Sequence, residues 1–311
     1  MDQPLLEVQG LTKHFPVLRG ILRRQVDIVR AVNGVDFTLQ RGQVLGLVGE
    51  SGSGKTTIGR CLMRLVEPTS GSMRLKGQEM NGLSTRNMRR LRRHIQMVFQ
   101  DPYASLNPRK TISDAIGEGL LYHSIVRTPQ ERDARVAHVL QQVGLSPDIL
   151  RRYPHQFSGG QQQRICIGRA IALEPDLIVC DEAASALDVS VQAQILNLLR
   201  DLKDSLGLSY LFISHDLAVV EYLCDHVIVL YKGLIVEEAP TATLFRNPLH
   251  PYTQALLAAP PADHPRDRRK KRRTAVNLDL AALAASPLID VPGSPGHRYR
   301  KGDRSRGYGT A

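Results

Sequence analysis

Residues 49–57 read Gly49-Glu50-Ser51-Gly52-Ser53-Gly54-Lys55-Thr56-Thr57. They match the phosphate-binding loop pattern G-x-x-x-x-G-K-[ST], between an apolar run at 44–48 that is typical of a strand and a segment at 58–65 with helical spacing. Glycines let the backbone curl so that its N–H groups point at phosphate oxygens, and the following helix adds the positive end of its dipole. The stretch therefore predicts that the chain binds a nucleoside triphosphate, with all nine residues as candidate contacts.

Two side chains of this loop have separate predicted tasks. Lys55 would reach the β- and γ-phosphates, and the Thr56 hydroxyl would hold Mg²⁺. A strand–turn–helix that merely needs glycines is the alternative, and Gly-Lys-Thr at this spacing behind a strand favours the nucleotide. ATP and Mg²⁺ are therefore the expected cofactors.

The composition is that of a soluble globular protein, with 311 residues of which 42% are hydrophobic and 23% charged. No apolar run approaches the ~18 residues of a membrane-spanning helix, and residues 1–4 lack the basic-then-apolar layout of a secretory signal. The four cysteines lie in apolar segments without metal-like spacing. We expect them to be buried reduced thiols of a cytosolic protein.

The net charge of +11 is unevenly distributed along the chain. From Asp263 onward there are 12 Lys/Arg against 5 Asp/Glu, or +7, which leaves 29 against 25, or +4, for the preceding residues. The basic run at 266–273 predicts a solvated flexible tail, while contact with anionic lipid or nucleic acid is the alternative. The high pI alone does not indicate nucleic-acid binding.

Continuous apolar runs at 177–180, 210–213 and 227–230 are typical of a buried, mainly parallel sheet with helices on both faces. Alternating strands are predicted at 5–9 and 35–39, and the segment at 18–30 is loop-like. Residues from about 87 to 172 are predicted to be mostly helical. The pattern indicates an α/β fold.

An acidic pair ends the first of these runs. Asp181, at the carboxyl end of a parallel strand, would lie beside the phosphate loop and hold Mg²⁺ directly or through water. Glu182 would point elsewhere and order or deprotonate an attacking water. Two solvated acids at a strand end are a common alternative, but the phosphate loop in the same chain favours the functional interpretation.

A third motif begins a helix at Ser158, a natural N-cap that is followed by two glycines. Physical reasoning alone leaves an ordinary Ser-capped helix open. The stretch Phe157-Ser158-Gly159-Gly160-Gln161 resembles the signature sequence of the ATP-binding-cassette (ABC) ATPases, usually Leu-Ser-Gly-Gly-Gln. The resemblance extends from Leu5 to about Pro261, with motifs in the order of the family.

This resemblance implies a P-loop NTPase fold with a RecA-like parallel sheet core, an antiparallel β subdomain and a helical signature subdomain. It implies that Phe15 stacks on adenine and that Gln100 touches both Mg²⁺ and the attacking water. Glu182 would be the catalytic glutamate, and His215 would contact the γ-phosphate; without its neighbours His215 would be an ordinary strand-end histidine.

In this family the signature of one subunit closes on the phosphate loop of another. The resemblance therefore implies that a partner's nucleotide contacts Ser158, Gly159, Gly160, Gln161 and, in the D-loop at 185–188, Asp188. Ala183 and Ala184 stand where many members have Pro and Thr.

Residues 100–109 and 247–257 resemble oligopeptide/dipeptide permease ATPases, and the long loop between Phe15 and Val32 resembles their second, F-type ATPase. The partners so implied are a homologous D-type ATPase in a head-to-tail dimer, two membrane permease subunits and an extracytoplasmic solute-binding protein, with no nucleic acid. The place so implied is the cytoplasmic face of the cell membrane. Glutathione and nickel importers share these motifs, so the solute stays open, and a tail without cysteine predicts no iron–sulfur cluster.

The chain is thus predicted to consist of a nucleotide-binding domain at 1–246, with a helical subdomain at about 87–172, an extension at 247–262 and a basic tail at 263–311. The expected function is the ATP-hydrolysing motor of a peptide importer. A soluble ABC ATPase acting on nucleic acid or ribosomes is the alternative, although such proteins usually carry two cassettes or a coiled-coil insertion. A P-loop kinase would leave residues 158–161 and His215 unexplained.

Overall fold

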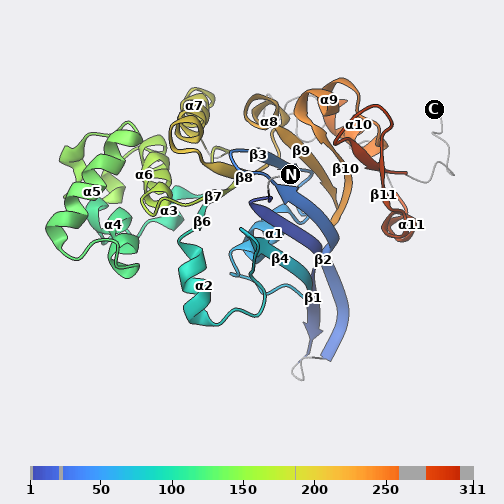
Figure 1. Cartoon of the computed structure of the whole chain (residues 1–311), viewed down its shortest axis with the longest axis horizontal. Helices are drawn as coiled ribbons and strands as arrows, with labels where there is room; N and C mark the ends of the chain where they lie inside the picture. Colours follow the sequence, from blue (N-terminus) through green and yellow to red (C-terminus); the bar gives the residue numbers. More distant parts are fainter. Residues whose placement is uncertain (1–2, 21–23, 186, 259–277, 302–311) are drawn as a thin grey trace.

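A mixed sheet with a parallel centre organises the molecule (Figure 1). The computed structural model describes residues 3–20, 24–185, 187–258 and 278–301. Within these ranges the sheet has eight strands in the order β11-β12-β10-β9-β3-β8-β7-β6. Its parallel strands are β3 (Val44–Val48), β6 (Ile95–Val98), β7 (Leu177–Asp181), β8 (Ser209–Ser214) and β9 (His226–Tyr231). The three apolar runs are therefore strands of one parallel sheet, which confirms the predicted fold class.

The two faces of this sheet contribute to two separate hydrophobic clusters, because successive side chains of a strand point to opposite faces. Val44 and Val48 pack in the cluster that contains α7 (Val189–Leu206) and α8 (Leu217–Leu223). Leu45 and Leu47 pack in the other, with α1 (Lys55–Leu62). Helices cover both faces, as the fully buried strands require. All four cysteines are free and buried, as predicted, and burial raises the pKa of Cys61 and of Cys166 to about 11.

An antiparallel sheet in the order β2-β1-β4-β5 covers the face on which α1 lies. Its strands are β1 (Leu6–Arg19), β2 (Arg24–Leu39), β4 (Ser70–Leu75) and β5 (Gln78–Glu79). The prediction of a loop at 18–30 is wrong, because β1 and β2 continue as a two-stranded arm in which Leu18 pairs with Gln25. The apolar residues of the arm are exposed and its composition is basic. The segment therefore lacks the alternation of apolar and polar residues that predicts a half-buried strand.

The helical subdomain projects from one side as a separate lobe, green in Figure 1. The lobe contains α3 (Pro102–Ser105), α4 (Ile112–Tyr122), α5 (Pro129–Gln142), α6 (Gly159–Ile171) and the short 3₁₀ turns η1 (Pro147–Ile149) and η2 (Pro154–Gln156). The helical prediction for about 87–172 is wrong at β6, which pairs with β7 and follows α2 (Thr85–Arg92). Four apolar or amide residues in a row carry too little periodicity to separate a strand from a helix.

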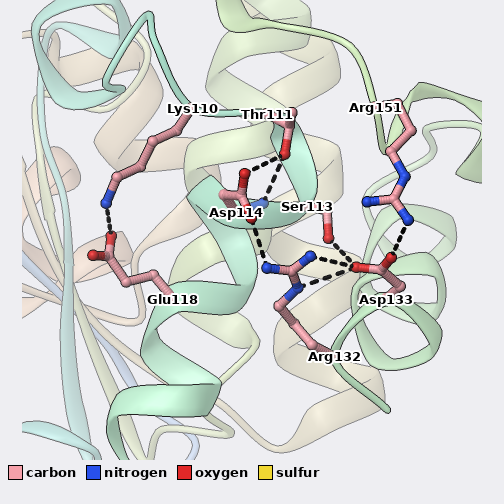
Figure 2. Close-up of polar contacts among 8 residues, drawn as sticks. All are labelled: Lys110, Thr111, Ser113, Asp114, Glu118, Arg132, Asp133 and Arg151. Atoms are coloured by element: carbon pink, nitrogen blue, oxygen red, sulfur yellow. Dashed lines mark hydrogen bonds and ion pairs between the residues drawn. The ribbon is translucent and has the colours of Figure 1, made fainter. Parts of the chain in front are cut away.

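A network of charged side chains joins α4 to α5 in the lobe (Figure 2). Arg132 of α5 donates to Asp114 of α4 at 2.6 Å and to Asp133 at 2.9 and 3.1 Å. Asp133 also accepts from the Ser113 hydroxyl and, at 2.7 Å, from Arg151. Because both Arg132 and Asp133 are largely buried, this network fixes the position of α5 against α4 and the loop before the signature helix.

The chain after β10 (Leu234–Pro240) and α9 (Thr241–Arg246) packs on the far edge of the sheet. The elements are α10 (Pro251–Ala258), α11 (Leu280–Ala285), β11 (Leu288–Asp290) and β12 (Arg298–Arg300). The prediction of a flexible tail from 263 onward is therefore wrong for 278–301, whereas the basic run at 266–273 lies outside the described residues. Arg300 is buried and donates to the Ile235 carbonyl at 2.6 Å. This basic residue of the tail is therefore packed against the sheet and not exposed to solvent. In the described part of the chain, no helix is both long and apolar enough to span a bilayer.

Candidate nucleotide site

The loop at 49–54 requires glycine where other strands approach it. A Cβ at Gly54, whose φ is +108°, would overlap the Ala31 carbonyl oxygen of β2. A Cβ at Gly49, whose φ is +150°, would overlap the Leu230 carbonyl oxygen of β9. Gly54 also caps the N-terminus of α1, so the loop delivers the backbone directly into the helix as the motif predicts.

Lys55 is 5% exposed and folds back over the loop. Its Nζ donates to the carbonyl oxygens of Gly49 at 2.7 Å and Glu50 at 2.9 Å. Burial lowers the pKa of Lys55, and the carboxylates of Glu182, Asp181 and Glu50 oppose this shift. The loop thus holds an ammonium group among acceptors at the position where the sequence predicts phosphate binding.

Two of the three predicted Mg²⁺ contacts, Thr56 and Asp181, meet directly although they come from different elements. The Thr56 hydroxyl at the start of α1 donates to Asp181 Oδ1 at the end of β7, at 2.9 Å. Burial raises the pKa of Asp181, against the Thr56 hydrogen bond, which lowers it. A hydroxyl and a carboxylate are the hard oxygen donors that Mg²⁺ prefers, so the residues present fit that ion.

Two of the three predicted catalytic side chains, Gln100 and His215, contact the carboxylate of the third, Glu182. Gln100 Nε2 donates to Glu182 Oε2 at 2.8 Å, and His215 Nδ1 lies 3.2 Å from Glu182 Oε1. Glu182 has a φ of +51°, and its N–H donates to the Ile213 carbonyl at 3.0 Å. A left-handed backbone at a non-glycine residue is strained and is typical of functional sites. Three parallel strands, β6, β7 and β8, therefore end in side chains that share one polar centre.

A cavity of about 1180 Å³ lies over the loop. Gln100, Glu182 and loop residues that include Lys55 and Thr57 form one side of it. The β2 arm at 25–31 and three α11 residues, Leu280, Ala281 and Ala284, form much of the remaining wall. The predicted phosphate contacts and the predicted catalytic carboxylate thus face one space large enough for a nucleotide.

Phe15 does not line this cavity. Its ring is 38% exposed and has Lys13 Nζ 4.8 Å from its centroid, while Val29, its partner across the strands, does line the cavity. The predicted stacking on adenine therefore stays a prediction for this side chain.

The signature residues lie away from the cavity, since none of residues 158–161 lines it. Ser158 caps α6, accepting from the Gln161 N–H at 3.4 Å, while Gln161 accepts from the Ser158 N–H at 3.1 Å. A Cβ at Gly160 would overlap Val191 of α7, which explains that glycine by packing. Asp188 is the exposed N-cap residue of α7 and lies outside the cavity wall; Ala186 is outside the described residues.

Sequence reasoning missed two contributions from the C-terminal region. The first is the part of the cavity wall that α11 forms. The second is Tyr252, whose hydroxyl accepts from the Glu50 N–H at 3.0 Å. Residues 247–257 stand out in the sequence only for their resemblance to permease ATPases. No local pattern around Tyr252 indicates a contact with a loop two hundred residues earlier.

Comparison with known proteins identifies the family. A family model described as ABC transporter matches residues 32–185, and one described as oligopeptide/dipeptide transporter, C-terminal region, matches residues 236–285. The oligopeptide transport ATP-binding protein AppF of Bacillus subtilis is 48% identical over 287 residues, which cover 92% of this chain and 87% of AppF. The chain belongs to the ABC transporter ATP-binding proteins. As a member of this family it binds ATP and hydrolyses it.

Further relatives agree with this ABC assignment. A Brucella ovis ATP-binding protein named for peptide import is 54% identical over 272 residues, with 88% of this chain and 83% of the relative covered. The glutathione import ATP-binding protein GsiA of Escherichia coli is 53% identical, but this ABC chain covers only 44% of it. Among solved structures, a dimeric post-hydrolysis form of the ATP-binding cassette MJ0796 bound to ADP and Pi has a TM-score of 0.67 at 27% identity, covering 76% of this chain and 98% of that one.

Proposed function

We propose that this chain is the motor subunit of an ABC importer for oligopeptides or dipeptides and that it works at the cytoplasmic face of the cell membrane. The observation that carries the catalytic part is the Glu182 carboxylate between Gln100 and His215, beside the Lys55 loop. Relatives named for peptide import support the solute class and favour a transporter over a soluble nucleic-acid ATPase.

In the proposed mechanism the loop amides and Lys55 bind the phosphates of ATP. Thr56 and Asp181 would hold Mg²⁺, which neutralises phosphate charge when bound. Glu182 accepts a proton from the attacking water. Gln100 orients the carboxylate by donating to Oε2, while His215 Nδ1 lies 3.2 Å from Oε1. His215 then faces the γ-phosphate, as the family resemblance implies.

The second half of the proposed site comes from a homologous ATPase subunit. Residues 158–161 stand on the lobe, outside the cavity of their own chain, and Ser158 and Gln161 are exposed. A head-to-tail dimer would bring these groups to the partner's nucleotide. The dimeric MJ0796 cassette supports such an assembly. Two permease subunits would receive the motion of the lobe, and an extracytoplasmic binding protein would deliver the peptide.

Uptake of a labelled peptide by vesicles that contain the complete importer tests this function. We expect ATP-dependent uptake with the unchanged chain and none with Glu182→Gln, which keeps the size and polarity of the side chain but removes its basicity. Equal uptake by both proteins would overturn the catalytic assignment. ATP turnover that responds to the binding protein loaded with a different solute, and not with peptide, would overturn the solute class.

A further inference from the structure

The C-terminal segment touches the phosphate-binding loop through one buried side chain. Tyr252 of α10 is 4% exposed, and its ring lies against Tyr231 of β9 with centroids 4.6 Å apart. Its hydroxyl accepts the Glu50 N–H at 3.0 Å. Glu50 is the second residue of the loop, so a segment outside the ABC family match contacts the phosphate site directly.

The peptide unit that receives this contact is held at both ends. The Gly49 carbonyl accepts from Lys55 Nζ at 2.7 Å, and the Glu50 N–H of the same peptide unit donates to Tyr252. A peptide unit is planar and its C=O and N–H point in opposite directions in the trans form. Fixing the N–H therefore fixes the direction of the carbonyl, and with it an anchor of the Lys55 ammonium.

The position of Tyr252 is itself fixed by a fully buried carboxylate. Glu237 of β10 accepts from the backbone N–H of Leu249 at 2.8 Å and of His250 at 3.0 Å, immediately before α10. Its Oε1 also lies 2.8 Å from Nε2 of the fully buried His297. One side chain thus holds the approach to α10 and the segment before β12 together, and α10 carries Tyr252.

We propose that Tyr252 is a positioning residue for the phosphate-binding loop and that through it the C-terminal segment sets the affinity for nucleotide. The hydroxyl orients the Gly49–Glu50 peptide unit, which orients Lys55 toward the phosphates. Because binding free energies are reciprocal, nucleotide binding also stabilises α10. The inference needs only the nucleotide-binding activity of the family, so it stands apart from the proposed solute.

Tyr252→Phe tests the hydroxyl, because it keeps the ring that packs on Tyr231. We expect the affinity of the full chain for Mg²⁺–ADP, measured by titration calorimetry, to fall by about three- to tenfold, the range for one net hydrogen bond. The KM for ATP should rise by a similar factor with kcat little changed, because the lost contact acts on binding. The Glu50 amide should exchange its hydrogen faster.

Tyr210→Phe is the matched control, since it removes the hydroxyl of another buried tyrosine, one that donates to the Leu199 carbonyl at 3.0 Å, away from the loop. This variant should lose thermal stability and keep its ADP affinity and the protection of the Glu50 amide. If both variants lose stability alike while ADP affinity and Glu50 exchange stay unchanged in Tyr252→Phe, Tyr252 has only a packing role and the proposal is wrong. Loss of peptide uptake alone would concern the proposed function and not this contact.

Discussion

The nucleotide cavity and the signature lobe carry equally recognisable motifs, yet the residues of the two motifs make different kinds of contact. Around the cavity, the strand ends of β6, β7 and β8 bring both Gln100 and His215 into contact with Glu182. On the lobe, Ser158 and Gln161 contact each other in a helix cap, and none of residues 158–161 lines the cavity. One region completes its polar contacts within the chain, while the proposed ligand of the other comes from a partner subunit.

The largest expected effect separates chemistry from binding in the cavity. Glu182→Gln should reduce ATP turnover by about 100- to 10,000-fold, the typical contribution of a general base, and leave ADP affinity nearly unchanged. Phosphate release and ADP titration measure the two quantities. Glu118→Gln, an exposed carboxylate of the lobe, is the control and should turn over ATP normally. A turnover that Glu182→Gln leaves intact would remove the catalytic role of this region.

A smaller effect tests whether the lobe is a separate structural unit. Arg132→Ala leaves Asp133 buried without its main cation, and we expect a loss of about 2–3 kcal/mol in unfolding free energy, less than a fully buried pair because Asp114 is partly exposed. Lys110→Ala, which breaks the exposed pair with Glu118 in Figure 2, should cost less than about 0.5 kcal/mol.

Chemical denaturation of both variants measures these losses, and ADP titration shows where they act. The affinity for ADP should stay unchanged in both variants, because neither residue lines the cavity. An ADP affinity that falls with Arg132→Ala would show that the lobe and the cavity are one cooperative unit.

Acid should distinguish the sheet region from the lobe. Burial lowers the pKa of His226 and of His250 to about 4, so the unfolded chain binds more protons than the folded chain between pH 6.5 and 4. Stability from these groups is present above pH 6.5 and is lost as the pH falls toward 4. The Thr111 hydroxyl and Arg132 lower the pKa of Asp114 in the lobe, so its contribution is lost only below about pH 4.

The expected loss between pH 7 and pH 5 is on the order of 1–2 kcal/mol per buried histidine. Burial also lowers the pKa of His123 in the lobe, but this side chain is less buried than His226 or His250. Hydrogen exchange at these two pH values should therefore show greater loosening of residues 226–258 than of residues 112–142. His250→Asn, which keeps an acceptor for the Tyr252 N–H, should reduce the pH dependence. Equal protection of both segments at pH 7 and pH 5 would contradict the assignment.

The smallest effect compares two serine N-caps. Ser158 accepts from Gln161 N–H at 3.4 Å, and Ser84, which begins α2, accepts from Asn87 N–H at 3.4 Å. Each serine-to-alanine change should cost about 1 kcal/mol of stability. Only Ser158→Ala should also reduce ATP turnover, by about tenfold if it removes one contact to the partner's nucleotide. Equal turnover in the two variants would reduce Ser158 to a helix cap.

Sequence predicted best what depends on short-range pattern. The loop at 49–57 and the three buried strand runs specify their own geometry, and parallel strand ends then place Asp181 and Glu182 beside Lys55. The β2 arm could not be predicted, because its exposed apolar residues pair only with β1 and not with the core.

The C-terminal elements could not be predicted from the sequence for a different reason. Arg298 and Arg300 are indistinguishable in composition from a solvated basic tail, but each finds a partner about sixty residues earlier, in β10. Such pairings are set by tertiary packing, and one sequence contains no signal for them. The same holds for Tyr252, whose partner is a backbone N–H that every non-proline residue has.

In the proposed assembly this chain holds one half of a shared ATP site. ATP turnover per chain, measured against chain concentration with an equimolar amount of the homologous ATPase subunit, tests it most directly. We expect turnover per chain to fall on dilution as the dimer dissociates, together with a smaller particle in light scattering. Turnover per chain that stays constant while the particle becomes monomeric would contradict the account, because a single chain would then complete the site alone.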